Sequence, residues 1–259
     1  DGGYFITWYD NAYADPAGQV RGQFFNASGQ KVGAEVAIGT SVVEGSNSTE
    51  MPPLTALVLS NGNVIVSWQT NDGLNVDGTG ASCAVVQSVV TYNGTTAVAG
   101  AETVVNTTTA TAQSGAVMTA TADGGYFTAW YDSALSDPAG RVHGQFFNAS
   151  GQKVGNEVTI GTSTVEGWDA LEMPPLSVLA LSNGKVVVSW ETQDSLNIDG
   201  SLGAVVQSVV THTGTTTVAS AEAVVNTTAT TGQSGATMVA TDNGGYFSAW
   251  YDNAYADPS

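Results

Sequence analysis

Acidic side chains recur in the loop that follows each tryptophan-containing segment, and they are the first candidates for chemistry. Calcium is bound by roughly six to eight hard oxygens from flexible loops, and Asp and Asn side chains supply such oxygens. The run from Gly73 to Gly78 matches half of a D-x-N-x-D-G calcium loop, but glycine replaces its first acidic residue. Asx turns on a solvated acidic rim are the alternative interpretation. Calcium is therefore the one candidate cofactor, and its candidate ligands are Asp10, Asp15, Asp72, Asn75, Asp77, Asp132, Asp137, Asp194, Asn197 and Asp199.

The sequence does not favour catalysis. Glycoside hydrolysis needs two carboxylates about 5–10 Å apart across a cleft, and Glu44, Glu50, Glu166 and Glu172 are available in loops. An enzyme concentrates its chemistry on one distinct set of residues, whereas these carboxylates occur in near-identical copies. We therefore expect no catalytic residues and no enzymatic activity. A glycosidase-like β-propeller is the remote alternative.

The histidines and tryptophans are expected to serve the fold. His143 and His212 are the only histidines, and Arg21 and Tyr92 take their places in the other copies, so surface strand positions are expected for both. Trp168 lies in a loop and is a better candidate for contact with a ligand. A packing role, with sugar stacking as the alternative, is expected for the tryptophans that share one strand position: Trp8, Trp68, Trp130, Trp190 and Trp250.

The charge balance excludes several classes of partner. The chain of 259 residues has 5 Lys and Arg residues against 23 Asp and Glu residues, a formal net charge of −18. Nucleic-acid binding needs clustered cations that neutralise phosphates, and anionic membrane surfaces are disfavoured for the same reason. No apolar run approaches the roughly 20 residues of a membrane helix, so membrane insertion is not expected. The single Cys83 excludes a disulfide within the chain.

Internal repetition decides the expected organisation. Residues 1–40 and 123–162 match at 31 of 40 positions, and weaker relatives lie between them. The period is about 60 residues, in alternating A and B versions, and both ends are expected to be cut from a longer tandem array. The expected units are A1 (1–60), B1 (61–122), A2 (123–182), B2 (183–242) and the start of a further A unit (243–259).

Each unit is expected to form four antiparallel strands, because β-branched residues alternate with Gly, Asn and Asp turns and no helical period is present. Asn61-Gly62 is the strongest hairpin signal. The fold class is therefore all-β, with tandem four-stranded units that form β-propeller-like blades or a linear or superhelical array. The expected strands are Tyr4–Trp8, Val20–Asn26, Ala34–Gly39 and Leu54–Ser60 in unit A1, and Ala84–Tyr92 and Ala97–Asn106 in the middle of unit B1.

Asn-x-Ser/Thr triplets make the chain a candidate glycoprotein. Such triplets also arise by chance in a chain rich in Thr and Asn. Several of them fall in expected turns, where an acceptor would be reachable. The candidate acceptors are Asn26, Asn47, Asn93, Asn106, Asn148 and Asn226.

Three linked motifs carry a resemblance to a known type of repeat. They are Gly2-Gly3-Tyr4-Phe5-x-x-Trp8, then Asp15-x-x-Gly18-x-Val20-x-Gly22-Gln23-Phe24-Phe25, then Gly29-x-x-x-Gly33-x-Glu35-Val36. In this order they resemble the Gly/Asp-rich, Trp-containing tandem repeats of very large secreted bacterial surface and adhesin-like proteins. The resemblance implies an extracellular, repetitive, structural or adhesive role. The B units depart from it because they lack the Gly-Gln-Phe-Phe element.

The expected function is structural: an extracellular or cell-surface protein that forms a fibre, stalk or surface scaffold through head-to-tail contacts between β-modules. The alternative is a carbohydrate-binding adhesin module with calcium-dependent loops. The expected partners are therefore other copies of the chain or tandem neighbours, and glycans. A strand edge offered to an identical receiver gives a contact that does not close. The strands expected at the junction carry Tyr4, Phe5, Trp8, Tyr246, Phe247 and Trp250.

Overall fold

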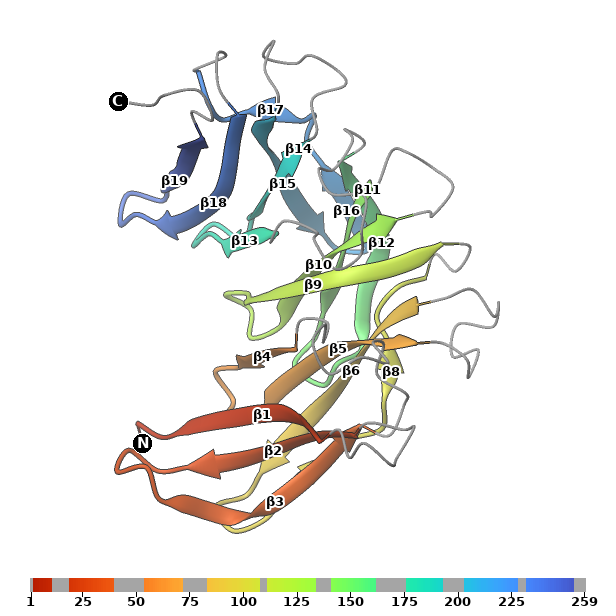
Figure 1. The fold of residues 1–259 in the computed structure, drawn as a ribbon, viewed down its shortest axis with the longest axis vertical. Helices are drawn as coiled ribbons and strands as arrows, with labels where there is room; N and C mark the ends of the chain where they lie inside the picture. Colours follow the sequence, from red (N-terminus) through yellow and green to blue (C-terminus); the bar gives the residue numbers. More distant parts are fainter. Residues whose placement is uncertain are drawn as a thin grey trace.

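The computed structural model of the chain (Figure 1) describes residues 2–10, 19–39, 54–71, 83–107, 111–133, 141–161, 176–192, 203–227 and 232–253. Every regular element in these ranges is a β-strand. Within the same ranges, no helix is long and apolar enough to cross a bilayer.

The strands form five antiparallel sheets, numbered here along the chain. Sheet 1 contains β1 (Tyr4–Asp10), β2 (Gln19–Phe25) and β3 (Lys31–Gly39). Sheet 2 contains β4 (Thr55–Val58), β5 (Val64–Asn71), β6 (Cys83–Tyr92), β7 (Ala97–Ala99) and β8 (Thr103–Val104). Sheet 3 contains β9 (Ala112–Ala120), β10 (Tyr126–Ser133), β11 (Arg141–Phe147) and β12 (Lys153–Gly161). Sheet 4 contains β13 (Ser177–Ala180), β14 (Val186–Thr192), β15 (Ala204–Thr213), β16 (Thr216–Ala219) and β17 (Ala223–Val224), and sheet 5 contains β18 (Gly232–Ala240) and β19 (Tyr246–Asn253).

The sheets are offset from the sequence repeats by one strand. β4, which the sequence places at the end of unit A1, pairs with β5 and so opens sheet 2. In the same way, β9 opens sheet 3 by pairing with β10. Each sheet from sheet 2 onwards therefore spans a boundary between two sequence units, so one strand of every unit belongs to the next sheet.

The hairpin expected at Asn61-Gly62 is confirmed. β4 and β5 pair antiparallel, and the Gly62 N–H donates to the Leu59 carbonyl at 2.9 Å. The Asn61 side-chain oxygen accepts a hydrogen bond from the Asn63 N–H at 2.9 Å. Gly62 has a φ of 85°, in the left-handed region where a residue without Cβ is favoured.

The long strand expected at Ala97–Asn106 is interrupted. The structure has two short strands there, β7 and β8, and both pair with β6. Between them the Gly100 N–H donates to the Val89 carbonyl, and the Gly100 carbonyl accepts from the Ser88 hydroxyl at 2.9 Å. Because the Ser88 hydroxyl binds the Gly100 carbonyl, the ladder of backbone hydrogen bonds to β6 is interrupted at this residue. The β-branched sequence therefore forms two short strands rather than one continuous strand.

Buried glutamines fix a β-bulge in sheets 1 and 3, which contain the Gly-Gln-Phe-Phe element of the A units and are called here the A-type sheets. The pairing of β11 with β12 shifts register between Gly144 and Phe146. The Gln145 amide donates to the carbonyls of Phe146 and Val154, both at 3.0 Å, and so satisfies carbonyls that the interrupted ladder leaves open. Gln23 makes the corresponding bonds in sheet 1. The repeated Gly-Gln-Phe-Phe element therefore sets the register of β2 with β3 and of β11 with β12.

The sheets stack face to face and bury three successive apolar cores between them (Figure 1). Trp68 of sheet 2 lies against Gly39 of sheet 1, and Trp190 of sheet 4 lies against Gly161 of sheet 3. In both places a Cβ on the glycine would overlap the indole ring. The packing role expected for the tryptophans is confirmed at Trp68, Trp130 and Trp190, which are 0–1% exposed. It is not confirmed at Trp8, which is half-buried, or at Trp250, which is 37% exposed.

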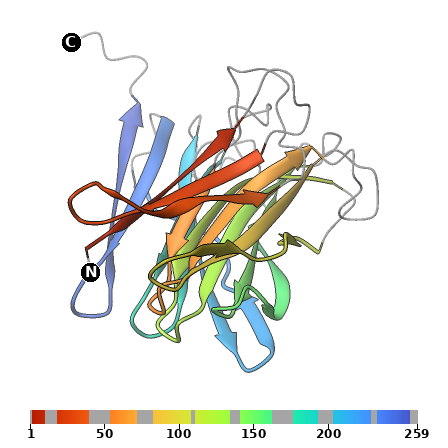
Figure 2. The same cartoon turned by 90° about the horizontal axis from the view of Figure 1, so that it is seen from below.

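The two ends of the sheets differ. Because neighbouring strands are antiparallel, the tight turns all lie at one end, called here the turn end (Figure 2). The strand ends that precede residues 11–18, 40–53, 72–82 and 134–140 lie at the opposite end, called the loop end. The all-β class and the tandem sheets agree with the expectation, and the described sheets follow an open arc (Figure 1).

We predict that Gly161→Ala lowers the free energy of unfolding by about 1–3 kcal/mol, because the new methyl group overpacks the contact with Trp190. Gly232→Ala is the matched control, since a Cβ there meets no atom within 4 Å. Urea unfolding monitored by tryptophan fluorescence measures both. Equal urea midpoints for the two variants would contradict the close packing of Gly161 against Trp190 between sheets 3 and 4.

Candidate functional site

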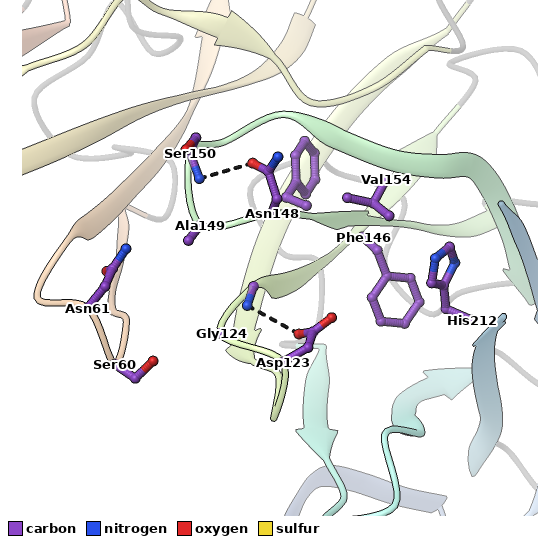
Figure 3. A pocket seen from close by; sticks show the side chains of 12 residues that line it. Ser60, Asn61, Asp123, Gly124, Phe146, Asn148, Ala149, Ser150, Val154 and His212 are labelled. Atoms are coloured by element: carbon purple, nitrogen blue, oxygen red, sulfur yellow. Dashed lines mark hydrogen bonds between the residues drawn. The ribbon is translucent and has the colours of Figure 1, made fainter. Parts of the chain in front are cut away.

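A cavity of about 400 Å³ opens at the turn end, where turns of sheets 2 and 3 meet a strand of sheet 4 (Figure 3). Sheet 2 supplies its β4–β5 turn, and sheet 3 supplies its β9–β10 and β11–β12 turns. Sheet 4 supplies one side chain from β15. The lining residues are Ser60, Asn61, Asp123, Gly124, Gly125, Phe146, Phe147, Asn148, Ala149, Ser150, Val154 and His212.

Hydrogen bonds between sheets hold the turns in place. The Asn63 side-chain amide of sheet 2 donates to the Ala149 carbonyl of sheet 3 at 3.2 Å. Gln87, also from sheet 2, donates to the Gly151 carbonyl at 3.2 Å. Within the turn, the Asn148 side-chain oxygen accepts from the Ser150 N–H at 3.0 Å. The cavity wall is therefore built from fixed turns and needs both sheets.

Asp123 is the acidic side chain that lines the cavity. Its Oδ1 accepts from the Thr121 hydroxyl at 2.5 Å and from the Gly125 N–H at 3.2 Å. The Thr121 hydrogen bond, helped by the Gly125 N–H and the charge of His212, holds the pKa of Asp123 below its usual value, and partial burial opposes this shift. In Figure 3 the other carboxylate oxygen lies on the side of Phe146 and His212.

His212 and Phe146 form the opposite wall. Their rings lie 5.1 Å apart between centroids, with an interplanar angle of 35°. The His212 Nδ1 lies 3.1 Å from the Thr217 hydroxyl, which fixes the ring and directs a ligand contact to Nε2. Tyr92 takes the corresponding place in sheet 2 and stacks on Phe24 at 4.7 Å. His212 is therefore half-buried against a neighbouring sheet, and the expected surface strand position is only partly correct.

The cavity combines fixed hydrogen-bonding groups with an apolar wall. It offers one carboxylate, amide and hydroxyl side chains, backbone groups of the turns and the edge of an aromatic pair. Its volume lies in the range of small-molecule sites. The sequence analysis did not identify this site. The signal in the sequence was the Asp or Asn at the start of each turn that lines the cavity, Asn61, Asp123 and Asn148, and it is equally consistent with ordinary turn chemistry.

A second polar cluster lies buried between sheets 2 and 3, towards the loop end. His143 of β11 stands between two carboxylates, with Nδ1 2.8 Å from Glu157 Oε1 and Nε2 3.5 Å from Asp132 Oδ2. All three side chains are buried. The expected surface position for His143 is therefore wrong: its strand faces another sheet, which the period of a single strand does not reveal.

Sheet 2 and the start of sheet 3 complete the cluster. The Thr107 N–H and hydroxyl both donate to Glu157 Oε2 at 2.5 Å, and the Thr111 hydroxyl donates to Asp132. Lys153 donates to the Asn106 carbonyl at 3.0 Å. Burial lowers the pKa of Lys153, and the negative charge of Glu157 opposes that shift. The carboxylates thus face partners from this chain rather than an open cleft.

The same arrangement occurs in sheet 1 with arginine in place of histidine. Arg21 Nε lies 2.6 Å from Asp10, and Arg21 Nη1 lies 3.1 Å from Glu35. These side chains are 30–46% exposed, because no sheet precedes sheet 1 among the described residues. A basic side chain between two carboxylates is therefore a shared structural element of sheets 1 and 3, and the neighbouring sheet decides whether it is buried.

The calcium prediction is only partly covered by the structure. Asp10 and Asp132 are described, and their carboxylates contact Arg21 and His143. Within the described ranges, no group of three or more His, Cys, Asp or Glu side chains is arranged to hold a metal ion. The other candidates lie outside the described residues, as does Trp168, and calcium binding there stays a prediction: Asp15, Asp72, Asn75, Asp77, Asp137, Asp194, Asn197 and Asp199.

Two of the predicted glycosylation sites are wrong for the folded chain. Asn106 and Asn226 are 2% and 5% exposed, and their side-chain oxygens accept from the N–H groups of Val85 and Val205. A sugar there would break an inter-strand bond and the core around it. The Asn-x-Ser/Thr triplet was misleading because it does not indicate whether its asparagine is buried. Asn26, Asn93 and Asn148 lie in turns, and Asn47 lies outside the described residues.

Comparison with known proteins identifies no family. No protein-family model and no curated protein matches the chain. Among solved structures, an endo-arabinase from Bacteroides thetaiotaomicron has a TM-score of 0.48 at 10% identity, covering 96% of this chain and 84% of that one. A thermostable family-43 glycoside hydrolase has 0.45 at 10%, covering 98% and 81%. A fucose lectin from Kordia zhangzhouensis has 0.35 at 11%, covering 65% and 98%.

One expectation from the sequence is corrected by these comparisons. The repetition of the carboxylates led us to expect no enzymatic activity. The solved structures that resemble this chain include several glycoside hydrolases, so the expectation is withdrawn. Repetition argued only against a unique site within one unit, whereas the cavity described above is built from three sheets.

We predict that His143→Ala lowers the free energy of unfolding by about 3–5 kcal/mol, because it leaves two buried carboxylates without their shared partner. Arg21→Ala is the matched comparison and is expected to lower it by at most about 1 kcal/mol, since that cluster is exposed. Guanidinium unfolding of both variants measures the difference. Similar losses would show that burial between sheets 2 and 3 does not strengthen the cluster.

Proposed function

We propose that the chain binds an uncharged saccharide in the cavity at the turn end. The observation that carries the proposal is the lining itself: fixed polar groups from three turns surround one carboxylate and face an aromatic wall. The proposal corresponds to the carbohydrate-binding alternative of the sequence analysis. The loops that carry the calcium candidates of that alternative are not part of the cavity lining, and calcium binding there stays a prediction.

A saccharide matches the chemistry of this lining. Its hydroxyls both donate and accept hydrogen bonds, so they suit a wall of carboxylate, amide, hydroxyl and backbone groups. Asp123 would accept from two hydroxyls at most, and His212 would offer Nε2 to a third. The apolar face of a sugar ring would rest against Val154 and the His212 ring, which are partly exposed, whereas Phe146 behind them is buried.

The charge of the chain narrows the ligand class. A formal net charge of −18 repels anions at long range, and Asp123 adds a local negative charge. Uronic acids and sulfated sugars are therefore disfavoured. Neutral sugars remain the favoured ligands.

The location of the protein and its assembly into larger structures are inferred from the sequence and not from the cavity. An extracellular location agrees with saccharide binding and with the repeat resemblance, and it stays part of the proposal. The fibre, stalk or scaffold role gains no support from the compared proteins. That role requires contact between copies of the chain.

We predict that Asp123→Asn weakens saccharide binding at least tenfold, about 1.4 kcal/mol, while leaving the turn intact. Asn243 occupies the same position in the β18–β19 turn and makes the same bonds to Thr241 and Gly245, so asparagine fits the geometry. A glycan array of neutral oligosaccharides finds the ligand, and titration calorimetry with the best one gives the affinity.

The matched control for Asp123→Asn is Asp242→Asn, which removes an exposed carboxylate from the equivalent turn of sheet 5. It is expected to leave the affinity unchanged. An array without any selective ligand, or equal affinities for the two variants, would refute saccharide binding at this cavity.

The pH dependence of binding follows from the lowered pKa of Asp123. Its carboxylate stays ionised as the pH falls through the ordinary value of 3.8, so hydrogen-bond acceptance persists there. The contribution of Asp123 to binding, measured in a His212→Gln background that removes the other titratable side chain of the lining, is therefore expected to be constant from pH 7 down to this value and to be lost only as the pH falls through the lowered pKa. Titrations across this pH range, with circular dichroism to confirm folding, measure it. A loss of affinity above pH 5 would exclude Asp123 as the titrating group.

A further inference from the structure

Asparagine is followed by glycine at four places in the chain, and each pair lies in a turn between two paired strands. In such a pair the glycine nitrogen can attack the side-chain carbon Cγ of the asparagine, because no Cβ on the glycine hinders its approach. The product is a succinimide ring, which water opens to aspartate or isoaspartate. The pairs are Asn61-Gly62, Asn93-Gly94, Asn183-Gly184 and Asn243-Gly244.

In three of the four turns the glycine N–H is already engaged. It donates to the carbonyl three residues earlier, so attack on Cγ requires the loss of a hydrogen bond that closes the turn. We therefore expect the fold to protect these three asparagines. The bonds run from Gly62 to Leu59 at 2.9 Å, from Gly184 to Leu181 at 3.0 Å and from Gly244 to Thr241 at 3.1 Å.

The turn between β6 and β7 is closed differently. Here the Asn93 N–H donates to the Thr96 carbonyl at 3.3 Å. Within the part of the chain that the structure describes, no group accepts a hydrogen bond from the Gly94 N–H. Asn93 and Gly94 are both exposed, so water reaches the nitrogen that must lose its proton. The Gly94 nitrogen is therefore available for attack.

The carbonyl group of the Asn93 side chain is held by two backbone donors. Its Oδ1 accepts from the Thr95 N–H at 3.0 Å and from the Thr96 N–H at 2.9 Å. Negative charge develops on this oxygen when a nitrogen adds to Cγ, and donors that are already in place stabilise that charge. Among the described residues, the Asn93 Nδ2, which has to leave, has no hydrogen-bond partner. Both halves of this pair thus favour the reaction.

We propose that Asn93 is a site of spontaneous deamidation in the folded chain. The Gly94 nitrogen loses its proton to water and forms a bond to Cγ, and the bond from Cγ to Nδ2 breaks, so that Nδ2 leaves as ammonia. Water then adds to one of the two ring carbonyls and gives aspartate or isoaspartate. Water is the one co-reactant. The proposal does not rest on the saccharide site, because the β6–β7 turn does not line that cavity.

The position of the turn gives the reaction a structural consequence. The turn lies against sheet 1: the Tyr92 ring stacks on Phe24 at 4.7 Å, and a Cβ on Gly33 would lie 2.8 Å from the Thr95 carbonyl oxygen. Isoaspartate adds a methylene group to the main chain and so displaces the Thr95 carbonyl, whereas aspartate leaves the main chain unchanged. Isoaspartate at position 93 is therefore expected to loosen the contact of sheet 2 with sheet 1.

The four pairs of one chain test the proposal against each other. The folded chain is incubated in mildly alkaline buffer, and peptides that contain each pair are quantified by mass spectrometry over time. Conversion of Asn93 is expected to be about fivefold faster, or more, than that of the other three, since each of those must first lose a hydrogen bond. Equal rates at the four pairs would overturn the proposal.

Asn243 is the matched comparison for the role of the glycine N–H. Its Oδ1 also has two donors, the Thr241 hydroxyl at 2.6 Å and the Gly245 N–H at 3.2 Å, but the Gly244 N–H is bound. Fast conversion of Asn243 in the folded chain would contradict protection by that bond. In concentrated urea, which removes the turns, the four rates are expected to converge. A preference for Asn93 that persists in urea would assign it to the local sequence and would refute the role of the fold.

The consequence for sheet 1 has its own test. Asn93→Asp carries the new charge without the added methylene group, and it is expected to unfold in urea at the same midpoint as the fresh chain. The incubated chain is expected to contain a fraction with a lower midpoint, in proportion to its isoaspartate content as measured with an isoaspartyl methyltransferase. An incubated chain that unfolds like the fresh one, or an equal loss in fresh Asn93→Asp, would exclude the loosening by isoaspartate.

Discussion

The structure depends on one constraint: a sheet of this sequence has two apolar faces and must cover both. The central strands of sheets 2, 3 and 4 are buried on both sides, and the three apolar cores lie between sheets rather than inside any one of them. Trp68 and Trp190 show how closely the sheets approach, because only glycine leaves room for their rings. A single unit of about 60 residues would leave such faces in water, so stability comes from stacking.

Stacking also decides the role of residues that the repeats share. Asp132, His143 and Glu157 form a buried cluster that joins sheet 3 to sheet 2 through Thr107. The equivalent carboxylates of sheet 1 hold Arg21 near the surface. The exposed cluster suits arginine, which remains charged in water, whereas the narrower imidazole fits between sheets. Near-identical sequences therefore have different electrostatic roles according to what lies beside them.

The local structure was largely predictable from the sequence, and the sites were not. Strand positions, the Asn61-Gly62 hairpin and burial of Trp68 follow from alternation and turn chemistry, which act over a few residues. The Asn61-Gly62 hairpin already pairs Leu54–Ser60 with the strand that follows it, so the offset of the sheets by one strand was present in the sequence. It was missed because the unit boundaries were drawn from sequence similarity, which does not show which strands pair. The burial of His143 and Asn106, and the cavity beside Asp123, depend on contacts between sheets. The residue pattern of a single strand does not show which residues of the stacked sheet pack against it.

The cavity follows from the same physics as the stack. Turns that close hairpins are rigid when Asn or Asp side chains cap them, and stacked sheets bring such turns side by side. Asn63 and Gln87 bind carbonyls of the adjacent sheet, so the turns of sheets 2 and 3 have a fixed spacing. Substitution of one wall residue, from Tyr92 in one repeat to His212 in the next, then changes the chemistry of the cavity without disturbing the scaffold. A repeat protein of this kind can thus vary its sites at the turn end while conserving the faces that hold it together.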